Sequence, residues 1–202
     1  FQIGTAKYGV RDDNGRLSDS RLAQIAAHET VRMFEIKLSQ GAKPGKGGML
    51  PGAKVTGEIA RIRGIPVEAD SISPNRHPEI DNESELLDFV AHVRGITGKP
   101  VGIKFVVGAY SWLDDLLQEI HRRGIDSAPD FFTVDSADGG TGAAPMSLFD
   151  YVGLPIRESL PLVADRLQMY GLRERIRLIA SGKLVTPAEV AWALSAGADF
   201  AV

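Results

Sequence analysis

The segment VRMFEIKLS, residues 31–39, alternates apolar and polar side chains over its second half. In a strand such alternation separates two faces, here Phe34, Ile36 and Leu38 against Glu35, Lys37 and Ser39. A strand covered by helices on both faces has no place for charged residues near its carboxyl end. The interior of a β/α barrel, just below the mouth that holds the active site, has room for them. The segment therefore favours a barrel over an open sheet.

A lysine in the middle of another apolar run repeats this pattern. In residues 101–107 the apolar side chains share one face of the predicted strand, and Lys104 lies on the other. A buried ammonium without a partner costs several kcal/mol. Two interpretations of Lys104 stay open. It forms an ion pair with a carboxylate such as Glu35 or Asp135, or it contacts a cofactor or substrate.

The whole chain alternates strand-like and helix-like segments. Apolar, β-branched runs predict six strands, at residues 31–38, 67–72, 101–107, 131–135, 176–180 and 199–202. Segments of helical period lie between them, and the last begins with a capping box of Thr186 and Glu189 around Pro187. Such alternation predicts a parallel sheet in an α/β fold. We expect one domain over residues 1–202, a (β/α)8 TIM barrel that is incomplete in this chain.

Composition excludes several classes of function. The chain has 202 residues, a formal net charge of −3 and no cysteine. A chain without cysteine has no disulfides and no cysteine nucleophile, and it holds no iron–sulfur cluster by itself. The charge gives no general attraction to nucleic acid. No run reaches the roughly 18 apolar residues of a membrane helix, and no signal peptide is visible, which predicts a cytoplasmic protein.

Both ends of the sequence suggest a fragment. It begins at Phe1 rather than at a methionine, and it stops at Val202 within an apolar run. We expect barrel strands before the first residue and barrel sequence after the last. The four histidines show no metal-ligand spacing, and His77, in a loop after a predicted strand, is left open between a loop role and a place near the site.

The unusual loops all follow predicted strands, where barrel enzymes place their sites. The stretch KLSQGAKPGKGGMLPG, residues 37–52, holds five glycines and three lysines, which predicts an anion site. It lacks the spacing and the hydroxyl of a nucleotide P-loop. DGGTG, residues 138–142, is either a tight turn or a close approach to a ligand. SGKLVTP, residues 181–187, has the position of a barrel phosphate site, and Lys183 is otherwise an exposed loop charge.

These loops together resemble a known family. EIKLSQGAKPGKGGMLPGAKV, ISPNRHPEI, GKPVGIKFV, DGGTGAAP, GLP and IASGKLVTP occur in the order found in the FMN-binding synthase domain of glutamate synthase and in glutamate synthase-related proteins. The resemblance spans nearly the whole chain. It implies a β/α barrel with FMN at its mouth. It also implies that ammonia condenses with 2-oxoglutarate and that reduced FMN delivers hydride to the resulting 2-iminoglutarate, giving L-glutamate.

The resemblance also implies roles for individual residues. Lys43 would contact a carboxylate or the carbonyl of the 2-oxo acid, with Gln40 beside it, and Arg63 would hold a second carboxylate. Lys104 would lie near the flavin ring, where a cation stabilises the anionic reduced form. The remaining residues of the predicted cofactor site are Asp138, Gly139 and Gly140 of the DGGTG loop and Ser181, Gly182 and Lys183, which would hold the FMN phosphate.

Partners and alternatives follow from the same resemblance. The partners would be 2-oxoglutarate, free or glutamine-derived ammonia, and an electron-donor protein or domain, with a homo-oligomer left open and no nucleic acid. Any iron–sulfur cluster would come from regions outside this chain. Met49 replaces a glutamine that glutamate synthases carry near the substrate, which favours as an alternative another 2-oxo acid or another amine. A third interpretation is a non-catalytic barrel fragment that serves as an interaction module.

Overall fold

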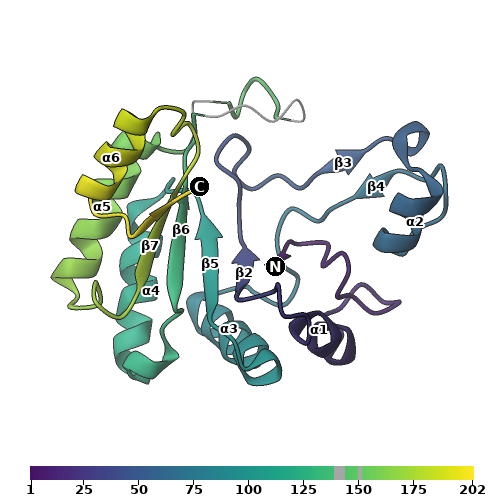
Figure 1. The fold of residues 1–202 in the computed structure, drawn as a ribbon, viewed down its shortest axis with the longest axis horizontal. Coiled ribbons are helices and arrows are strands. Elements are labelled where there is room, and N and C mark those ends of the chain that lie inside the picture. The colour runs from purple at the N-terminus through teal and green to yellow at the C-terminus, as the bar shows by residue number, and fades with distance from the viewer. Residues whose placement is uncertain (139–143, 150–151) are drawn as a thin grey trace.

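The computed structural model describes residues 1–138, 144–149 and 152–202 (Figure 1). The helices and strands follow one another in this order: β1 (Gln2–Ile3), α1 (Asp19–Ala26), β2 (Phe34–Lys37), β3 (Met49–Leu50), η1 (Gly52–Lys54), α2 (Gly57–Arg63), β4 (Ser71–Ile72), α3 (Glu83–Thr97), β5 (Val101–Phe105), α4 (Tyr110–Arg123), η2 (Ile125–Ser127), β6 (Phe131–Asp135), α5 (Ile156–Met169), β7 (Arg177–Ser181), α6 (Pro187–Ser195) and β8 (Phe200–Ala201).

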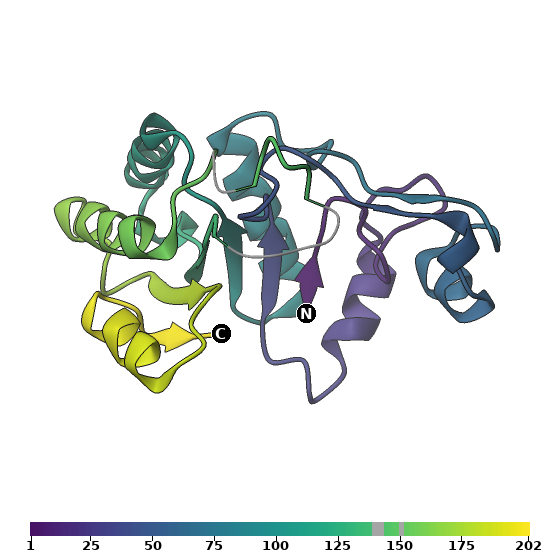
Figure 2. The ribbon, with the colours of Figure 1, turned by 90° about the horizontal axis from the view of Figure 1, so that it is seen from above.

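Six strands form one parallel sheet in the order β1-β2-β5-β6-β7-β8. Seen from above, the sheet curves into an arc, and helices α3 to α6 lie on its outer side (Figure 2). The two chain ends lie on either side of the opening of this arc. The expected α/β fold of an incomplete β/α barrel is therefore confirmed.

The two faces of the sheet differ as residues 31–39 predicted. Phe34 and Ile36 of β2 are fully buried against the helices, together with apolar residues of α3, α4 and α5. Burial of such side chains contributes roughly 1.5–3 kcal/mol each, which makes this layer the main source of stability. The described residues include no helix that is long and apolar enough to cross a membrane.

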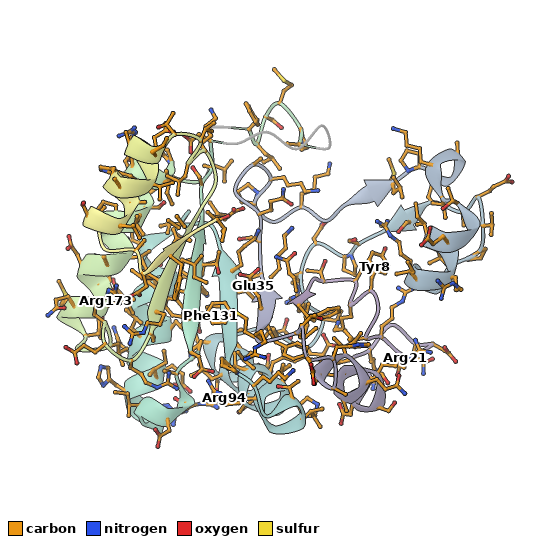
Figure 3. The ribbon with its side chains drawn as sticks, viewed as in Figure 1. Tyr8, Arg21, Glu35, Arg94, Phe131 and Arg173 are labelled. Atoms are coloured by element: carbon orange, nitrogen blue, oxygen red, sulfur yellow. The ribbon has the colours of Figure 1, made fainter. Side chains whose placement is uncertain are left out.

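The inner face of the arc is polar. Glu35 of β2 accepts hydrogen bonds from Gln2 of β1 at 2.6 Å and from the Thr133 hydroxyl of β6 at 2.5 Å. The second bond passes over β5, where Gly102 is the register partner of Glu35. Glu35 and Phe131 are among the residues that line an inner cavity of about 360 Å³, and both are labelled in Figure 3. The polar interior supports a barrel because the two helix-covered faces of an open sheet are apolar.

The structure of residues 67–72 differs from the prediction that they form a strand of the main sheet. Only Ser71 and Ile72 form a strand there, and β4 pairs antiparallel with β3 outside the main sheet. Together with α2 these strands form a lobe beside the barrel (Figure 1), and Val67 and Ile72 are 58% and 66% exposed. The prediction was wrong because Ser71 and Ile72 pair with Leu50 and Met49 outside the main sheet, and the local pattern does not reveal a strand's partner. The sixth strand of the main sheet is β1, which is too short to show a period.

We predict that Gly102→Ala destabilises the protein by about 1–3 kcal/mol, the usual cost of overpacking. A methyl group at this position would lie 2.3 Å from the Phe131 ring and 2.4 Å from its carbonyl oxygen. Gly95→Ala is the matched control, because no atom lies within 4 Å of the added carbon on α3. This change is expected to stabilise the helix by about 0.5–1 kcal/mol. Urea denaturation measures both values, and equal shifts in the two variants would contradict the packing account.

Candidate functional site

The carboxylate of Asp135 joins the loops at the carboxyl end of the sheet. Oδ2 of Asp135 accepts a hydrogen bond from the Gly41 backbone N–H at 2.7 Å, and Oδ1 accepts one from the Ser181 hydroxyl at 3.0 Å. Nζ of Lys104 lies 3.8 Å from Oδ1. Asp135 is buried, and these partners offset the cost of removing its charge from water. One side chain thus fixes the loops after β2 and β7 relative to β5.

The structure supports in part both interpretations of Lys104, the ion pair and the contact with a cofactor or substrate. The ion pair with Asp135 is present, and the lysine also lines the inner cavity beside Ser181. Its register partner on β2 is Lys37. Contact with a cofactor stays a prediction.

A cleft of about 280 Å³ lies between the loop after β2, the segment after β1 and the loop after β4. It contains Gln40 and Lys43, the residues predicted to bind the substrate, and Lys7, Lys37 and Lys46 also line it. None of the described residues that line this cleft is acidic, and the Glu79 carboxylate pairs with Lys7 from outside the lining. Its electrostatic character is therefore that of a site for an anion.

Lys37 is a cleft residue that the sequence analysis placed only on the inner face of a strand. Its ammonium donates a hydrogen bond to Oε1 of Gln40 at 2.9 Å. Burial lowers the pKa of Lys37, and the nearby Lys104 ammonium lowers it further. Lys43 is 8% exposed, and its ammonium lies 3.4 Å from the Gly47 carbonyl oxygen, to which it donates. Two partly desolvated cations thus border the same cleft.

Arg63 is not among the residues that line this cleft. Its guanidinium donates to the Ser71 hydroxyl at 2.8 Å and lies over the ring of Tyr8, 4.9 Å from the ring centre. Tyr8 does line the cleft, and its hydroxyl lies 2.7 Å from that of Ser71. Figure 3 shows Tyr8 between the sheet and the lobe of α2, β3 and β4. The structure thus brings Gln40 and Lys43 together, with Arg63 behind Tyr8.

The predicted phosphate loop turns sharply after β7. Gly182 and Lys183 have φ values of +98° and +50°, a left-handed conformation that is rare for lysine. Lys183 shares a small cavity of about 70 Å³ with Asp138 and Arg157. Oδ1 of Asp138 is buried and has no hydrogen-bond partner among the described residues. Glu189 also lines this cavity, so its two cations face two carboxylates. The feature that fits a phosphate is the left-handed turn at Gly182 and Lys183.

Gly139 and Gly140 of the predicted cofactor site lie outside the described residues, so their placement stays a prediction. Four of the other predicted cofactor residues line two cavities, and Gly182 lies in the turn between Ser181 and Lys183. Lys104 and Ser181 line the inner cavity, and Asp138 and Lys183 line the small one.

His77 is buried under the cleft rather than exposed in its loop. It is 2% exposed, and its Nε2 lies 3.0 Å from the carbonyl oxygen of Lys37. Burial is the main reason why the pKa of His77 falls from 6.5 to about 4, and the charge of Lys7 contributes to the decrease. A loop histidine in the sequence gives no sign of this burial, because the residues that cover it come from distant segments.

Comparisons with known proteins give both a family match and a fold match. The profile of a family described as the conserved region in glutamate synthase matches residues 1–202. The glutamate synthase large subunit-like protein YerD of Bacillus subtilis (strain 168) is 44% identical over 199 residues, covering 98% of this chain and 37% of that protein. The archaeal glutamate synthase [NADPH] of Methanocaldococcus jannaschii is 40% identical over 98% of this chain and 40% of its own length.

The chain thus spans about two fifths of the length of these relatives. Among solved structures, a mutant flavocytochrome b2 with benzoylformate aligns with a TM-score of 0.54 at 14% identity. The alignment covers 99% of this chain and 40% of that one. This likeness supports the barrel fold.

We predict that His77 makes the protein less stable below neutral pH. The unfolded chain binds a proton on this residue near pH 6.5, whereas the folded protein binds it only near pH 4. The free energy of unfolding therefore falls as the pH is lowered from about 6.5 to 4, by up to roughly 3 kcal/mol for this group.

The variant His77→Gln keeps an N–H donor but has no titrating group, so its unfolding free energy is expected to decrease less over this range. His28→Gln is the control, because His28 is exposed, whereas His92 pairs with Asp19 at 2.8 Å. Urea denaturation at a series of pH values measures the difference. A slope in His77→Gln equal to that of the unchanged protein would contradict the burial of a neutral histidine.

Proposed function

The chain belongs to the glutamate synthase family, and we propose that it forms the synthase site, where a 2-imino acid made from 2-oxoglutarate and ammonia is reduced to L-glutamate. The observation that carries this proposal is the lysine-lined cleft beside the polar barrel interior. Three of its four lysines lie on or after β2, and none of its described lining residues is acidic. A substrate with two carboxylates needs such an excess of positive charge.

Each side chain of the cleft has a proposed task. Lys43 binds a substrate carboxylate or the carbonyl oxygen, and Gln40 orients the substrate through its amide, which Lys37 holds. Charge that develops on the reacting group is best stabilised by donors that are already in place. Arg63 would supply the second carboxylate contact, for which the guanidinium has to leave Ser71 or the substrate has to reach past Tyr8.

FMN is the proposed cofactor, and the described residues fit it. Ser181, Gly182 and Lys183 would hold the phosphate, Lys104 would lie near the ring, and Asp138 to Gly140 would approach its edge. Support comes from the left-handed loop at Gly182 and Lys183 and from the buried oxygen of Asp138, which has no hydrogen-bond partner in the described part of the chain. When bound and reduced, FMN supplies the hydride. The chain itself would bind the imino acid, orient it and exclude water.

Electrons and ammonia are proposed to come from outside the chain. The relative from Methanocaldococcus jannaschii carries NADPH in its name, which favours a reductase protein or domain as donor. Ammonia would be free or released from glutamine. Any iron–sulfur cluster would also belong to other regions because the chain has no cysteine. We place the reaction in the cytoplasm.

A different 2-oxo acid or amine is the second candidate. Met49 on β3 is 61% exposed and pairs with Ile72 of β4, so the lobe presents a thioether where the resemblance leads one to expect an amide. An interaction module without catalysis is the remaining alternative.

The visible spectrum of the full-length protein separates these candidates. Flavin bands that are bleached by a reductant, and that return only when 2-oxoglutarate and ammonia are both added, would support the proposed reaction. A bound flavin that ignores this pair but reacts with another 2-oxo acid would move the substrate to that acid. A folded, colourless protein that takes up no added FMN would refute the proposal that the protein is an FMN-dependent enzyme.

We predict that Lys43→Gln raises the KM for 2-oxoglutarate by about tenfold to a hundredfold, the effect of losing one charge-assisted contact. Lys54→Gln is the control, since Lys54 is exposed on η1, away from the cleft. Steady-state kinetics with saturating ammonia measure both values. An unchanged KM in Lys43→Gln would remove this lysine from the substrate site.

We predict that Lys104→Met weakens FMN binding by about tenfold because one cation is lost from the inner face. Quenching of FMN fluorescence during titration of the apoprotein measures the Kd. Lys54→Met is expected to keep the Kd of the unchanged protein. If Lys104→Met also kept it, the role of Lys104 would be limited to its ion pair with Asp135.

A further inference from the structure

Among the described residues, the carboxyl end of β2 extends past the end of its neighbouring strand β1. The Glu35 N–H donates to the Phe1 carbonyl oxygen at 2.9 Å, so the polar backbone groups of Glu35 and Lys37 point toward β1. β1 ends at Ile3, and the chain turns there, with the Lys7 N–H bonded to the Gly4 carbonyl oxygen. The Lys37 carbonyl oxygen therefore lies beyond the reach of β1.

The ring of His77 supplies the hydrogen-bond partner that a neighbouring strand would otherwise give to the Lys37 carbonyl. Its Nε2 lies 3.0 Å from the Lys37 carbonyl oxygen. A carbonyl oxygen only accepts, so Nε2 must carry the proton, and a neutral ring then leaves Nδ1 as a bare acceptor. Nδ1 is buried, and it has no hydrogen-bond partner within the described part of the chain. The ring also packs on Phe89, with 5.7 Å between ring centres.

A buried cation lies near this ring. Lys7 is 0% exposed, and its backbone adopts a φ of +51°. Its Nζ lies 2.9 Å from Oε2 of Glu79, two residues beyond His77. The charge of Lys7 acts on the ring and opposes its protonation, whereas that of Glu79 favours it.

We propose that Lys7, Glu79 and His77 are positioning residues that hold the end of β2, and with it Lys37 and Gln40, in the geometry that the cleft requires. Glu79 anchors the Lys7 ammonium, the charge of Lys7 opposes protonation of the His77 ring, and the neutral ring holds the Lys37 carbonyl through its Nε2–H. The kinetic part of this inference rests on the proposed function, whereas the state of the ring does not.

The consequence for the cleft follows from the next contacts along the chain. The ammonium of Lys37 donates to Gln40, and the following Gly41 N–H donates to Asp135. His77 thus fixes one side of this short segment and Asp135 the other. Release of the Lys37 carbonyl would free the segment that carries two proposed substrate contacts.

Three variants of the full-length protein test the inference. His77→Gln keeps a donor for the Lys37 carbonyl, His77→Leu removes the donor while keeping an apolar body, and Lys7→Met removes the charge at similar length. His28→Gln serves as the surface control. Nitrogen NMR of the histidine rings reports which nitrogen is protonated, and carbon NMR of reductively methylated lysines reports the pKa of Lys37.

The expected results are specific to positioning. The unchanged protein shows His77 protonated on Nε2 alone, and Lys7→Met raises the pKa of His77 because the opposing charge is removed. His77→Leu returns the pKa of Lys37 toward that of an exposed lysine and raises the KM for 2-oxoglutarate about tenfold, whereas His77→Gln stays within about twofold.

Two outcomes would overturn the inference. One is a His77 ring protonated on Nδ1 in the unchanged protein. The other is a folded His77→Leu variant with an unaltered Lys37 pKa. If His77→Leu does not fold, the ring signals of the unchanged protein and of Lys7→Met still decide. A protein that shows the expected ring state but does not turn over 2-oxoglutarate would refute the proposed function and leave the positioning intact.

Discussion

A single buried carboxylate organises the mouth of this barrel. Asp135 binds a backbone N–H, a hydroxyl and an ammonium that belong to three different segments. Without these partners its charge would be costly in the interior. The bond to Gly41 also dictates how closely the chain passes: a side chain on Gly41 would meet the Ser136 carbonyl oxygen at 1.6 Å. Glycine at this position is thus required by packing.

The fold was predictable where residues carry a periodic pattern. Alternation in residues 31–39 indicated which side chains of β2 face the interior, and the capping box at Thr186 marked the start of α6. The two-residue strand β1 has no measurable period. Residues 67–72 resembled a core strand, yet pairing with Met49 and Leu50 outside the barrel decided their place. Strand partners far apart in sequence leave no trace in local composition.

The candidate site was predictable only in part, for the same reason. Glycines and lysines near Gln40 and Lys43 marked an anion site because loop chemistry is local. The contact between His77 and Lys37 joins residues 40 positions apart, and that between Gly41 and Asp135 joins residues 94 apart. Lys7 had no sequence signal at all, since neither its burial nor its left-handed backbone follows from its neighbours.

The hydrogen bond that crosses β5 inside the barrel has an evolutionary consequence. Glu35 and Thr133 are 98 positions apart, and their hydrogen bond spans β5, on which Gly102 is the register partner of Glu35. Phe131 fills the adjoining space above the same glycine. A larger residue at position 102 would displace its neighbours on both sides. A single substitution within this group of four residues would therefore destabilise the protein, whereas a second substitution that restores the packing would not. Among descendants of this sequence, positions 35, 102, 131 and 133 are therefore expected to covary.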